Sequence, residues 1–261
     1  MKRTLAIFKR EFFAYFRSPM GYVVIAIFMA ISGLFFASGV LSAYLDLVGQ
    51  ISFIQSFFFV IIPLMTMRAF SEDRKNGTEV LLYTSPANSV EIVLGKYLAA
   101  LALFGVMTGG TLIHVIITSL YGGVVDISVL GAYIGFIFLG AAYVSIGVFA
   151  SALTENQIIA AVISFIIIIV LTLLDFVSNM IGSLAATLID RINVFGLTDL
   201  QIDAAGRSVT SALQWLNPSA RLSNYVNGIF ELSPIIFFIS IVAVFLFLTN
   251  RVIEKRRWSQ G

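Results

Sequence analysis

The sequence predicts an all-α protein that crosses a membrane several times, and two observations carry this prediction. Apolar residues make up 59% of the 261 residues and charged residues only 11%, against roughly 25% charged in an ordinary soluble domain. The charges also separate six uncharged blocks of 19 to 29 residues. A helix needs about 20 apolar residues to cross the hydrocarbon core of a bilayer.

Each of the six blocks is therefore long enough for one membrane-spanning helix. The blocks are continuously apolar, whereas the strands of a membrane barrel would be about 10 residues long and would alternate between apolar and polar residues. Helices are favoured over a barrel for this reason. The predicted spans cover residues 20–43, 51–67, 97–121, 129–152, 157–175 and 233–250.

The segment before the first span, within residues 1–19, predicts an amphipathic helix. Its apolar side chains recur at spacings of three and four residues, which places them on one helix face. Lys9 and Arg10 lie off that face, and Ser18-Pro19 ends the helix. Such a helix is expected to lie in the membrane interface, either as an anchor or in contact with a cytoplasmic partner. The apolar face consists of Leu5, Phe8, Phe12, Tyr15 and Phe16.

The loop between the second and third spans, residues 68–96, contains signals for a short helix between two polar turns. Asn76-Gly77 indicates a turn, Thr78 can cap a short helix, and Ser85-Pro86 ends it. The helix that enters the third span begins with a capping box, Asn88 followed by Glu91.

The short helix carries an exposed apolar group, Leu81-Leu82-Tyr83. An apolar group on a polar face needs either lipid or a protein groove to cover it. The helix is therefore expected either to lie on the membrane or to dock on a cytoplasmic subunit.

Two apolar stretches between the fifth and sixth spans, residues 176–189 and 208–220, are too short to cross the membrane. Each is expected to form a re-entrant or interfacial helix. Residues 176–232 are then the only sizeable segment outside the main helices on that side of the membrane. We find no soluble domain and no repeat of fixed period, which predicts a single membrane domain over residues 1–261.

The positions of the basic residues predict the orientation in the membrane. Thirteen of the 16 Lys and Arg residues precede the first span, lie within residues 68–96 or follow the last span, and the other three are Arg191, Arg207 and Arg221. The positive-inside rule places both termini in the cytoplasm. The first uncharged block is far longer than the core of a signal peptide, so we expect an uncleaved signal anchor.

Several function classes lack the residues that they require. The chain has no Cys and one His, which excludes thiolate metal sites, cysteine nucleophiles and a zinc protease site. It has no P-loop motif, so ATP would have to bind elsewhere. The spans lack the charged residues typical of ion or proton relays, and the net charge of +2 gives no indication of a nucleic-acid partner.

Three features of the spans have an ordinary and a functional interpretation. His114 is expected to hydrogen-bond to a neighbouring helix. The pairs Gly105/Gly109 and Gly131/Gly135 are expected to permit close helix packing within the subunit rather than to contact a substrate. The aromatic residues of the first two spans either line a lipid-like path or reflect the usual abundance of Phe in membrane helices. The candidates for pathway lining are Phe28, Phe35, Phe57 and Phe58.

A set of segments in order along the chain carries a family resemblance. They are residues 8–12, Ser18-Pro19 with Gly21-Tyr22, and residues 67–73, 77–86, 91–96, 150–157, 245–249 and 256–258. Together with the predicted topology, these segments resemble the permease subunits of ABC-2-type exporters. The nearest likeness is to the branch that contains the gliding-motility permeases and the nitrous-oxide-reductase accessory permeases.

The resemblance implies a dimer of two permeases, identical or related, each bound to a cytoplasmic ABC ATPase that holds ATP and Mg. Residues 78–83 would form the coupling helix in a groove of the ATPase, flanked by the N-terminal helix. Spans one, two and five would line the pathway, and residues 176–232 would form outer-face helices that dip back into the membrane. The implied coupling residues are Gly77, Thr78, Glu79, Leu81, Leu82, Pro86 and Glu155, and those of the interfacial helix are Phe8, Lys9, Arg10 and Phe12.

The resemblance thus implies the permease subunit of an ATP-driven exporter in a bacterial or archaeal cytoplasmic membrane. The chain itself would hold no catalytic residue, metal or cofactor, and an accessory external protein is a further conceivable partner. The alternative is a membrane anchoring or assembly protein that recruits a cytoplasmic partner without moving solute. An adjacent reading frame for an ABC ATPase would distinguish the two, and a membrane-embedded enzyme is the weakest interpretation. The nearly charge-free spans favour lipids, hydrophobic peptides or lipid-linked molecules as substrates.

Overall fold

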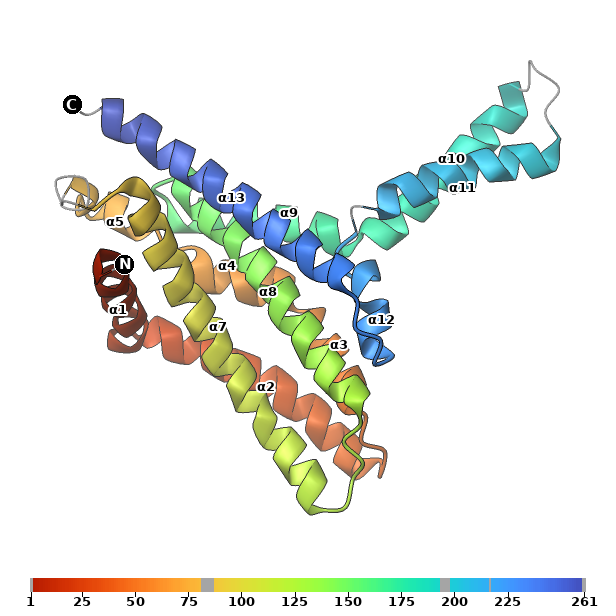
Figure 1. Ribbon diagram of the computed structural model, residues 1–261, viewed down its shortest axis with the longest axis horizontal. Coiled ribbons are helices and arrows are strands. Elements are labelled where there is room, and N and C mark those ends of the chain that lie inside the picture. The colour runs from red at the N-terminus through yellow and green to blue at the C-terminus, as the bar shows by residue number, and fades with distance from the viewer. Residues whose placement is uncertain (1, 81–86, 193–197, 216, 260–261) are drawn as a thin grey trace. The chain divides into compact units, whose positions relative to one another are not determined.

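The computed structural model describes residues 2–80, 87–192, 198–215 and 217–259, and every secondary-structure element in these ranges is a helix (Figure 1). Four helices are long and apolar enough to cross a membrane, and two broken pairs raise the number to as many as six if each pair is one span. The predicted multi-span all-α fold is confirmed at this level, and the six-span layout stays a prediction. The four helices are α2 (Pro19–Leu41), α7 (Ser89–Leu120), α8 (Ile127–Leu153) and α13 (Leu232–Ser259).

The second predicted span is divided into α3 (Leu47–Gln55) and α4 (Phe58–Thr66). The two parts of the pair are bent by 57°. Just before the break, the hydroxyls of Ser52 and Ser56 donate to backbone carbonyls four residues earlier, each at 3.1 Å. Such back-bonding competes with the helical pattern and bends helices, which the apolar composition alone did not indicate.

The fifth predicted span is interrupted at Leu173, between α9 (Gln157–Thr172) and α10 (Leu174–Ile192), and the two parts are bent by 59°. The first of the short apolar stretches beyond it, residues 176–189, is helical throughout, whereas the second, residues 208–220, is α-helical only as far as Gln214. Their predicted re-entrant or interfacial placement stays a prediction. The second of them lies in a helix that begins earlier, α11 (Asp199–Gln214), because Thr198 and Gln201 form a capping box. The Thr198 backbone N–H donates to Gln201 Oε1 at 3.1 Å.

The helices form two compact units, one made of Met1–Ile168 and Asn224–Gly261 and the other of Ile169–Ser223. In the first unit α8 packs against α3, α4, α7 and α13, and α7 and α8 run side by side (Figure 1). Phe136 of α8 lies in its core, with ring centroids 4.7 Å from Phe58 and 5.4 Å from Phe104. Gly140 permits this packing, because a Cβ there would collide with the Phe104 ring.

The glycine pairs behave differently from one another. Nothing lies within 4 Å of a Cβ built on Gly105 or Gly109, so the expected packing of this pair against a neighbouring helix is wrong. A Cβ on Gly131 would collide with the Tyr225 carbonyl oxygen, which confirms close packing there. Tyr225 belongs to α12 (Ser223–Val226), which follows the 3₁₀ turn Ala220–Leu222.

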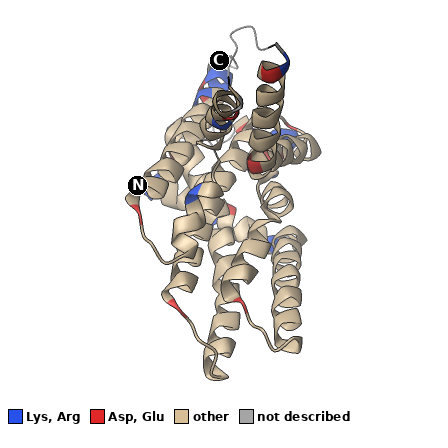
Figure 2. Cartoon of the chain, turned by 90° about the vertical axis from the view of Figure 1, so that its right-hand side faces the viewer, with Lys and Arg blue, Asp and Glu red and all other residues tan. Residues whose placement is uncertain are grey.

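Charged side chains gather at one end of the first unit, where α1 (Lys2–Arg17) begins and α13 ends. Ser89 at the start of α7 donates to Glu254 of α13 at 3.2 Å, and Arg256 donates to the Leu153 carbonyl at the end of α8 at 2.9 Å. The N-terminal helix α1 packs on α7 at the same end. Figure 2 shows the basic C-terminal end of α13 beside long uncharged helices. The start of α1 and the end of α13 thus lie at one end of the unit, as the predicted topology requires, and the cytoplasmic location of the termini stays a prediction.

The second unit is a helical hairpin in which α10 and α11 lie side by side (Figure 1). The helices approach each other at Gly182 and Gly206, where a Cβ on Gly206 would lie 2.8 Å from the Gly182 carbonyl oxygen. Thr210 of α11 donates to the Ser178 carbonyl of α10 at 3.3 Å. These pairings make the two helices antiparallel.

Candidate functional site

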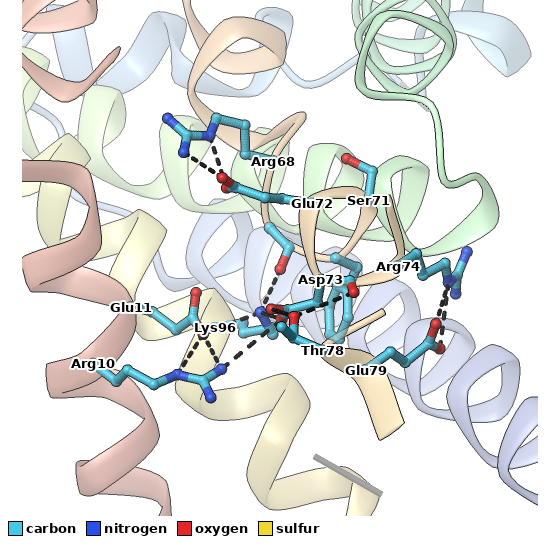
Figure 3. Close-up of polar contacts among 12 residues, drawn as sticks. Arg10, Glu11, Arg68, Ser71, Glu72, Asp73, Arg74, Thr78, Glu79 and Lys96 are labelled. Carbon is cyan, nitrogen blue, oxygen red and sulfur yellow. Dashed lines mark hydrogen bonds and ion pairs between the residues drawn. The ribbon is translucent and has the colours of Figure 1, made fainter. Parts of the chain in front are cut away.

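Lys96, near the start of α7, is the centre of a polar cluster at the charged end of the first unit (Figure 3). Its side chain is only 1% exposed. The ammonium donates to the Ala69 carbonyl at 2.6 Å and to Asp73 Oδ2 at 2.5 Å, and it lies 3.2 Å from Glu11 Oε1. The Phe70 ring centroid is 5.1 Å from the same nitrogen. One buried cation therefore connects α7 with both α1 and the chain that follows α4.

We refer to Glu11, Asp73 and Lys96 as the Lys96 cluster. Removing one partner from a buried charge pair costs about 3–5 kcal/mol, because the remaining charge is left uncompensated in a poorly solvated place. The three elements that carry these side chains are therefore held together strongly. A displacement of the loop that bears Asp73 would be transmitted to both α1 and α7.

Asp73 lies on the short helix α5 (Ser71–Lys75). Burial alone would raise the pKa of its carboxyl, but the Lys96 ammonium, the hydrogen bonds from Lys96 and Thr78, and the charge of Arg10 together hold this pKa below its ordinary value. The Thr78 hydroxyl donates to Asp73 Oδ1 at 2.8 Å, and Arg10 Nη2 lies 3.9 Å from Oδ2. Asp73 is consequently ionised at neutral pH and keeps its partners.

The turn between α4 and α5 is fixed from the other side by Ser151 of α8, which is fully buried. Its hydroxyl donates to the Met67 carbonyl at 3.0 Å and accepts from the N–H groups of Phe70 at 2.9 Å and Ser71 at 3.1 Å. These bonds satisfy backbone groups that the helix break would otherwise leave unpaired. The end of α8 is thereby fixed to the turn between α4 and α5.

The predicted turn at Asn76-Gly77 is confirmed, since Gly77 has a φ of 69° and its N–H donates to the Arg74 carbonyl at 3.0 Å. A positive φ favours glycine because it has no Cβ. Glu79 lies just after the turn, and its Oε2 is 3.2 Å from Arg74 Nε. Thr78 and Glu79 are thus positioned by Asp73 and Arg74 of α5 (Figure 3), and Gly77 by its hydrogen bond to Arg74.

Three of the predicted coupling residues, Leu81, Leu82 and Pro86, lie outside the described residues. At the far side of that segment the capping box is present, with the Asn88 N–H donating to Glu91 Oε2 at 3.0 Å. Glu155 is exposed in the turn between α8 and α9 and is not among the side chains that surround Lys96. Its coupling role stays a prediction.

The predicted N-terminal helix forms as α1, which contains no buried residue, and its location in the membrane interface stays a prediction. Phe8 and Phe12 stack with ring centroids 5.8 Å apart, which confirms that they share a face. Arg10 reaches the Lys96 cluster, and its Nη2 donates to Glu11 Oε1 at 2.5 Å. Lys9 is exposed.

The four Phe residues proposed for the pathway lie in two settings. Phe28 and Phe58 are fully buried in the core of the first unit. Phe35 and Phe57 are partly exposed and both contact Phe53, with ring centroids 4.8 and 5.1 Å away. The pathway role stays a prediction, and exposure favours Phe35 and Phe57 for it.

Sequence reasoning assigned no role to Glu11, Asp73, Lys96 or Ser151. A signal was available for Lys96, because it is the last charge before a 29-residue uncharged block, and a charge at that position needs a partner or solvent. The partner on α1 was indicated only by the lone acidic residue in an otherwise basic helix. No group of three or more His, Cys, Asp or Glu side chains in the described ranges is placed to hold a metal ion.

Comparison with known proteins gives one family match. The family model described as "ABC-2 family transporter protein" matches residues 5–257. This range covers nearly the whole chain and includes the Lys96 cluster, both units and the last span. A search of curated proteins gave no match.

Proposed function

The chain belongs to the ABC-2 family of transporter proteins, and on that premise we propose that it is the permease subunit of an ATP-driven exporter, coupled to a separate cytoplasmic ATPase through residues 68–96. Family membership and the apolar helices make it a multi-pass membrane protein. Members of this family are membrane components of ABC systems and not the catalytic subunits. ATP and Mg would therefore be bound by the partner.

The observation that carries the proposal is the attachment of the loop to the membrane helices through Lys96. Asp73 of the loop and Glu11 of α1 both pair with this side chain, which belongs to α7. An ATPase that pushed on the loop would move these elements together, since separating them would leave a charge buried without a partner. The loop would then transmit a movement of the ATPase directly to α1 and α7.

The docking element that we propose is the segment carrying Leu81 and Leu82. Thr78 on one side is fixed by Asp73, and Asn88 on the other is fixed by Glu91, so the segment begins and ends at anchored points. A pair of leucines suits an apolar groove, because burying such side chains contributes about 1.5–3 kcal/mol each. Glu155 would face the same ATPase.

The remaining parts of the assembly follow from the same premise. A second permease, identical or related, would complete the pathway, and spans one, two and five would line it. Residues 176–232 would form the outer gate, and both termini would be cytoplasmic. The likeness to the gliding-motility and nitrous-oxide-reductase branch favours an assembly of this kind with an accessory external protein, and the apolar spans favour a lipid-like or hydrophobic substrate.

Co-purification with the ABC ATPase from an adjacent reading frame tests the coupling. The double variant Leu81→Asp/Leu82→Asp is expected to lose ATPase binding by at least 100-fold, since two buried leucines become charged, while the permease still inserts. The matched control is Val124→Asp/Val125→Asp, in the loop between α7 and α8, where Val124 is 88% exposed. The control is expected to bind the ATPase as the wild type does.

Two outcomes would contradict the proposal. Wild-type stoichiometry of the Leu81→Asp/Leu82→Asp complex would show that docking occurs elsewhere. A wild-type complex that binds ATPase but moves no hydrophobic substrate across proteoliposomes, at any ATP concentration, would favour the membrane anchoring function.

A further inference from the structure

An apolar hollow of about 780 Å³ lies between α1 and α7. The helices approach each other closely at Gly95, where a Cβ would lie 2.7 Å from Ile7 Cγ2, and the hollow opens beside this contact. Its walls come from both helices. They consist of Lys2, Thr4, Leu5 and Phe8 on α1 and of Leu94, Leu98, Leu101 and Ala102 on α7.

A second hollow lies further along α7. This second hollow, about 950 Å³, lies between α7 and α8 and shares Leu101 with the first. Gly105 and Gly109 contribute to its walls, and the space above them is open. Asp126, which precedes α8, lies at its other end. Two apolar hollows with Leu101 in the wall of both therefore lie along α7, and we refer to them together as the furrow.

A cationic side chain lies at the end of the furrow next to α1. Lys2 is the charged residue in the wall of the first hollow, and within the described residues its ammonium has no paired side chain. The acidic residues of the neighbouring helix surfaces are already engaged: Glu11 pairs with Lys96 and Arg10, and Glu91 caps α7. The charge of Lys2 is thus available to an anion at the membrane surface.

We propose that the α1–α7 hollow binds an anionic phospholipid, with the headgroup at Lys2 and an acyl chain lying in the furrow along Leu98 and Leu101. The site does not depend on the ATPase coupling proposed above. It rests on the apolar furrow that begins beside α1 and on the Lys2 cation at that end of the furrow.

Charge and position favour a lipid over a protein occupant. α1 carries five basic residues and one acidic residue, and a basic amphipathic helix at an interface attracts anionic lipids by about 1 kcal/mol for each Lys or Arg near the surface. An acyl chain from the same leaflet enters such a furrow without leaving the membrane. Binding there would hold α1 against α7 next to the Lys96 cluster.

Tryptophan quenching by brominated lipids tests the site. The chain has two Trp residues, Trp215 and Trp258, which are replaced by Phe so that one reporter, Leu98→Trp, lies in the hollow. A second protein carries the reporter Ile116→Trp, on α7 outside the hollow and 57% exposed. Each is reconstituted in phosphatidylcholine vesicles that contain brominated phosphatidylglycerol or brominated phosphatidylcholine.

The Leu98→Trp reporter is expected to be quenched at several-fold lower brominated phosphatidylglycerol than brominated phosphatidylcholine, whereas Ile116→Trp responds equally to both. Lys2→Gln should weaken the preference about fivefold, the factor that corresponds to about 1 kcal/mol for one basic residue. The matched control is Lys9→Gln, an exposed residue of the same helix outside the hollow, which should leave the preference unchanged.

Three results would overturn the proposal. Equal quenching of Leu98→Trp by both lipids would mean that the hollow has no preference for an anionic lipid. Equal effects of Lys2→Gln and Lys9→Gln would mean that the preference comes from the general surface charge of α1 and not from a site at Lys2. Absence of quenching at Leu98→Trp, with normal quenching at Ile116→Trp, would mean that protein fills the hollow. If Leu98→Trp does not fold, Leu101→Trp places the reporter in the same furrow.

Discussion

The side-chain amide nitrogen of Gln50 on α3 lies 2.7 Å from Nδ1 of His114 on α7. The same nitrogen donates to Ser32 Oγ on α2 at 2.9 Å, and the Phe36 ring stacks on the imidazole with centroids 4.5 Å apart. All three polar side chains are buried. The predicted hydrogen bond between His114 and a neighbouring helix is confirmed, and it joins three helices at one point.

We predict that Gln50→Leu destabilises the protein by about 1–2 kcal/mol. The substitution replaces the amide by an apolar group of similar size and removes its contacts with Nδ1 and with Ser32 Oγ, which leaves Ser32 Oγ, at 3.3 Å, as the partner of Nδ1. The loss of these hydrogen bonds between membrane helices costs about that much. Unfolding of the purified protein in detergent measures the change.

The control for this variant is Gln55→Leu, at the end of the same helix. Within the described residues the Gln55 side chain makes no hydrogen bond. Its stability should be within about 0.5 kcal/mol of wild type, as for other substitutions away from such contacts. Equal effects of the two variants would mean that the loss comes from α3 itself and not from the contact with His114.

Lys96→Met is predicted to detach the loop from the membrane helices. The variant removes the buried cation between Asp73 and Glu11 and leaves the more exposed Arg10 as the remaining cation near both carboxylates, at a cost of about 3 kcal/mol. Hydrogen exchange in residues 68–80 and in α1 should then be about 100-fold faster, since local opening follows that free energy. Lys75→Met, which removes an exposed lysine from α5, should not alter the exchange. If only α1 responds, the cluster does not hold the loop.

The lowered pKa of Asp73 predicts a direction of pH dependence. Because this pKa is lower in the folded protein than its ordinary value of 3.8, the ionised form stabilises the fold above about pH 4, and this contribution disappears as the pH falls through the lowered pKa. Asp73→Asn lacks the contribution throughout. The difference in Tm between wild type and Asp73→Asn should therefore shrink as the pH falls below about 4, and parallel curves would contradict the assignment.

Single cysteines test the orientation, since the chain has none of its own. We expect Arg3→Cys and Lys255→Cys to be protected from an impermeant maleimide on intact cells and Asp203→Cys to be labelled. The reason is the excess of basic residues at the end of the first unit where α1 begins and α13 ends. Labelling of Arg3→Cys with protection of Asp203→Cys would invert the topology.

The apolar blocks predicted the helices well because a long uncharged segment has few other stable forms in a membrane. They could not predict the break between α3 and α4, because it depends on hydroxyl back-bonding by Ser52 and Ser56, and serines also occur in straight helices. The start of α11 at Asp199 was not predicted, because a capping box is a weak helix signal when the segment after it is polar and lacks an apolar pattern.

Predicting the site was harder than predicting the fold. The turn at Gly77 and the cap at Asn88 are local features, so their residue types identified them. The Lys96 cluster joins residues 85 positions apart along the chain, and no local pattern pairs Glu11 with Lys96. The glycine pairs show the same limitation: small residues permit close packing, but only the arrangement of helices decides whether a neighbour is present, as at Gly131, or absent, as at Gly105.

The hairpin of residues 169–223 allows a test of the outer gate with little effect on docking. Gly182→Leu would collide with Thr210 of the facing helix and force α10 and α11 apart, whereas Ser183→Leu adds the same side chain at an exposed position of α10. We expect Gly182→Leu to reduce export at least tenfold while the ATPase still co-purifies, because the proposed docking residues 68–96 belong to the first unit and not to the hairpin. Ser183→Leu should preserve both export and docking. A parallel hydrogen-exchange experiment with and without a trapped nucleotide should show altered protection in α10 and α11. If protection there is the same in both states while residues 68–80 respond, the hairpin is a static cap and export by Gly182→Leu should remain near wild type.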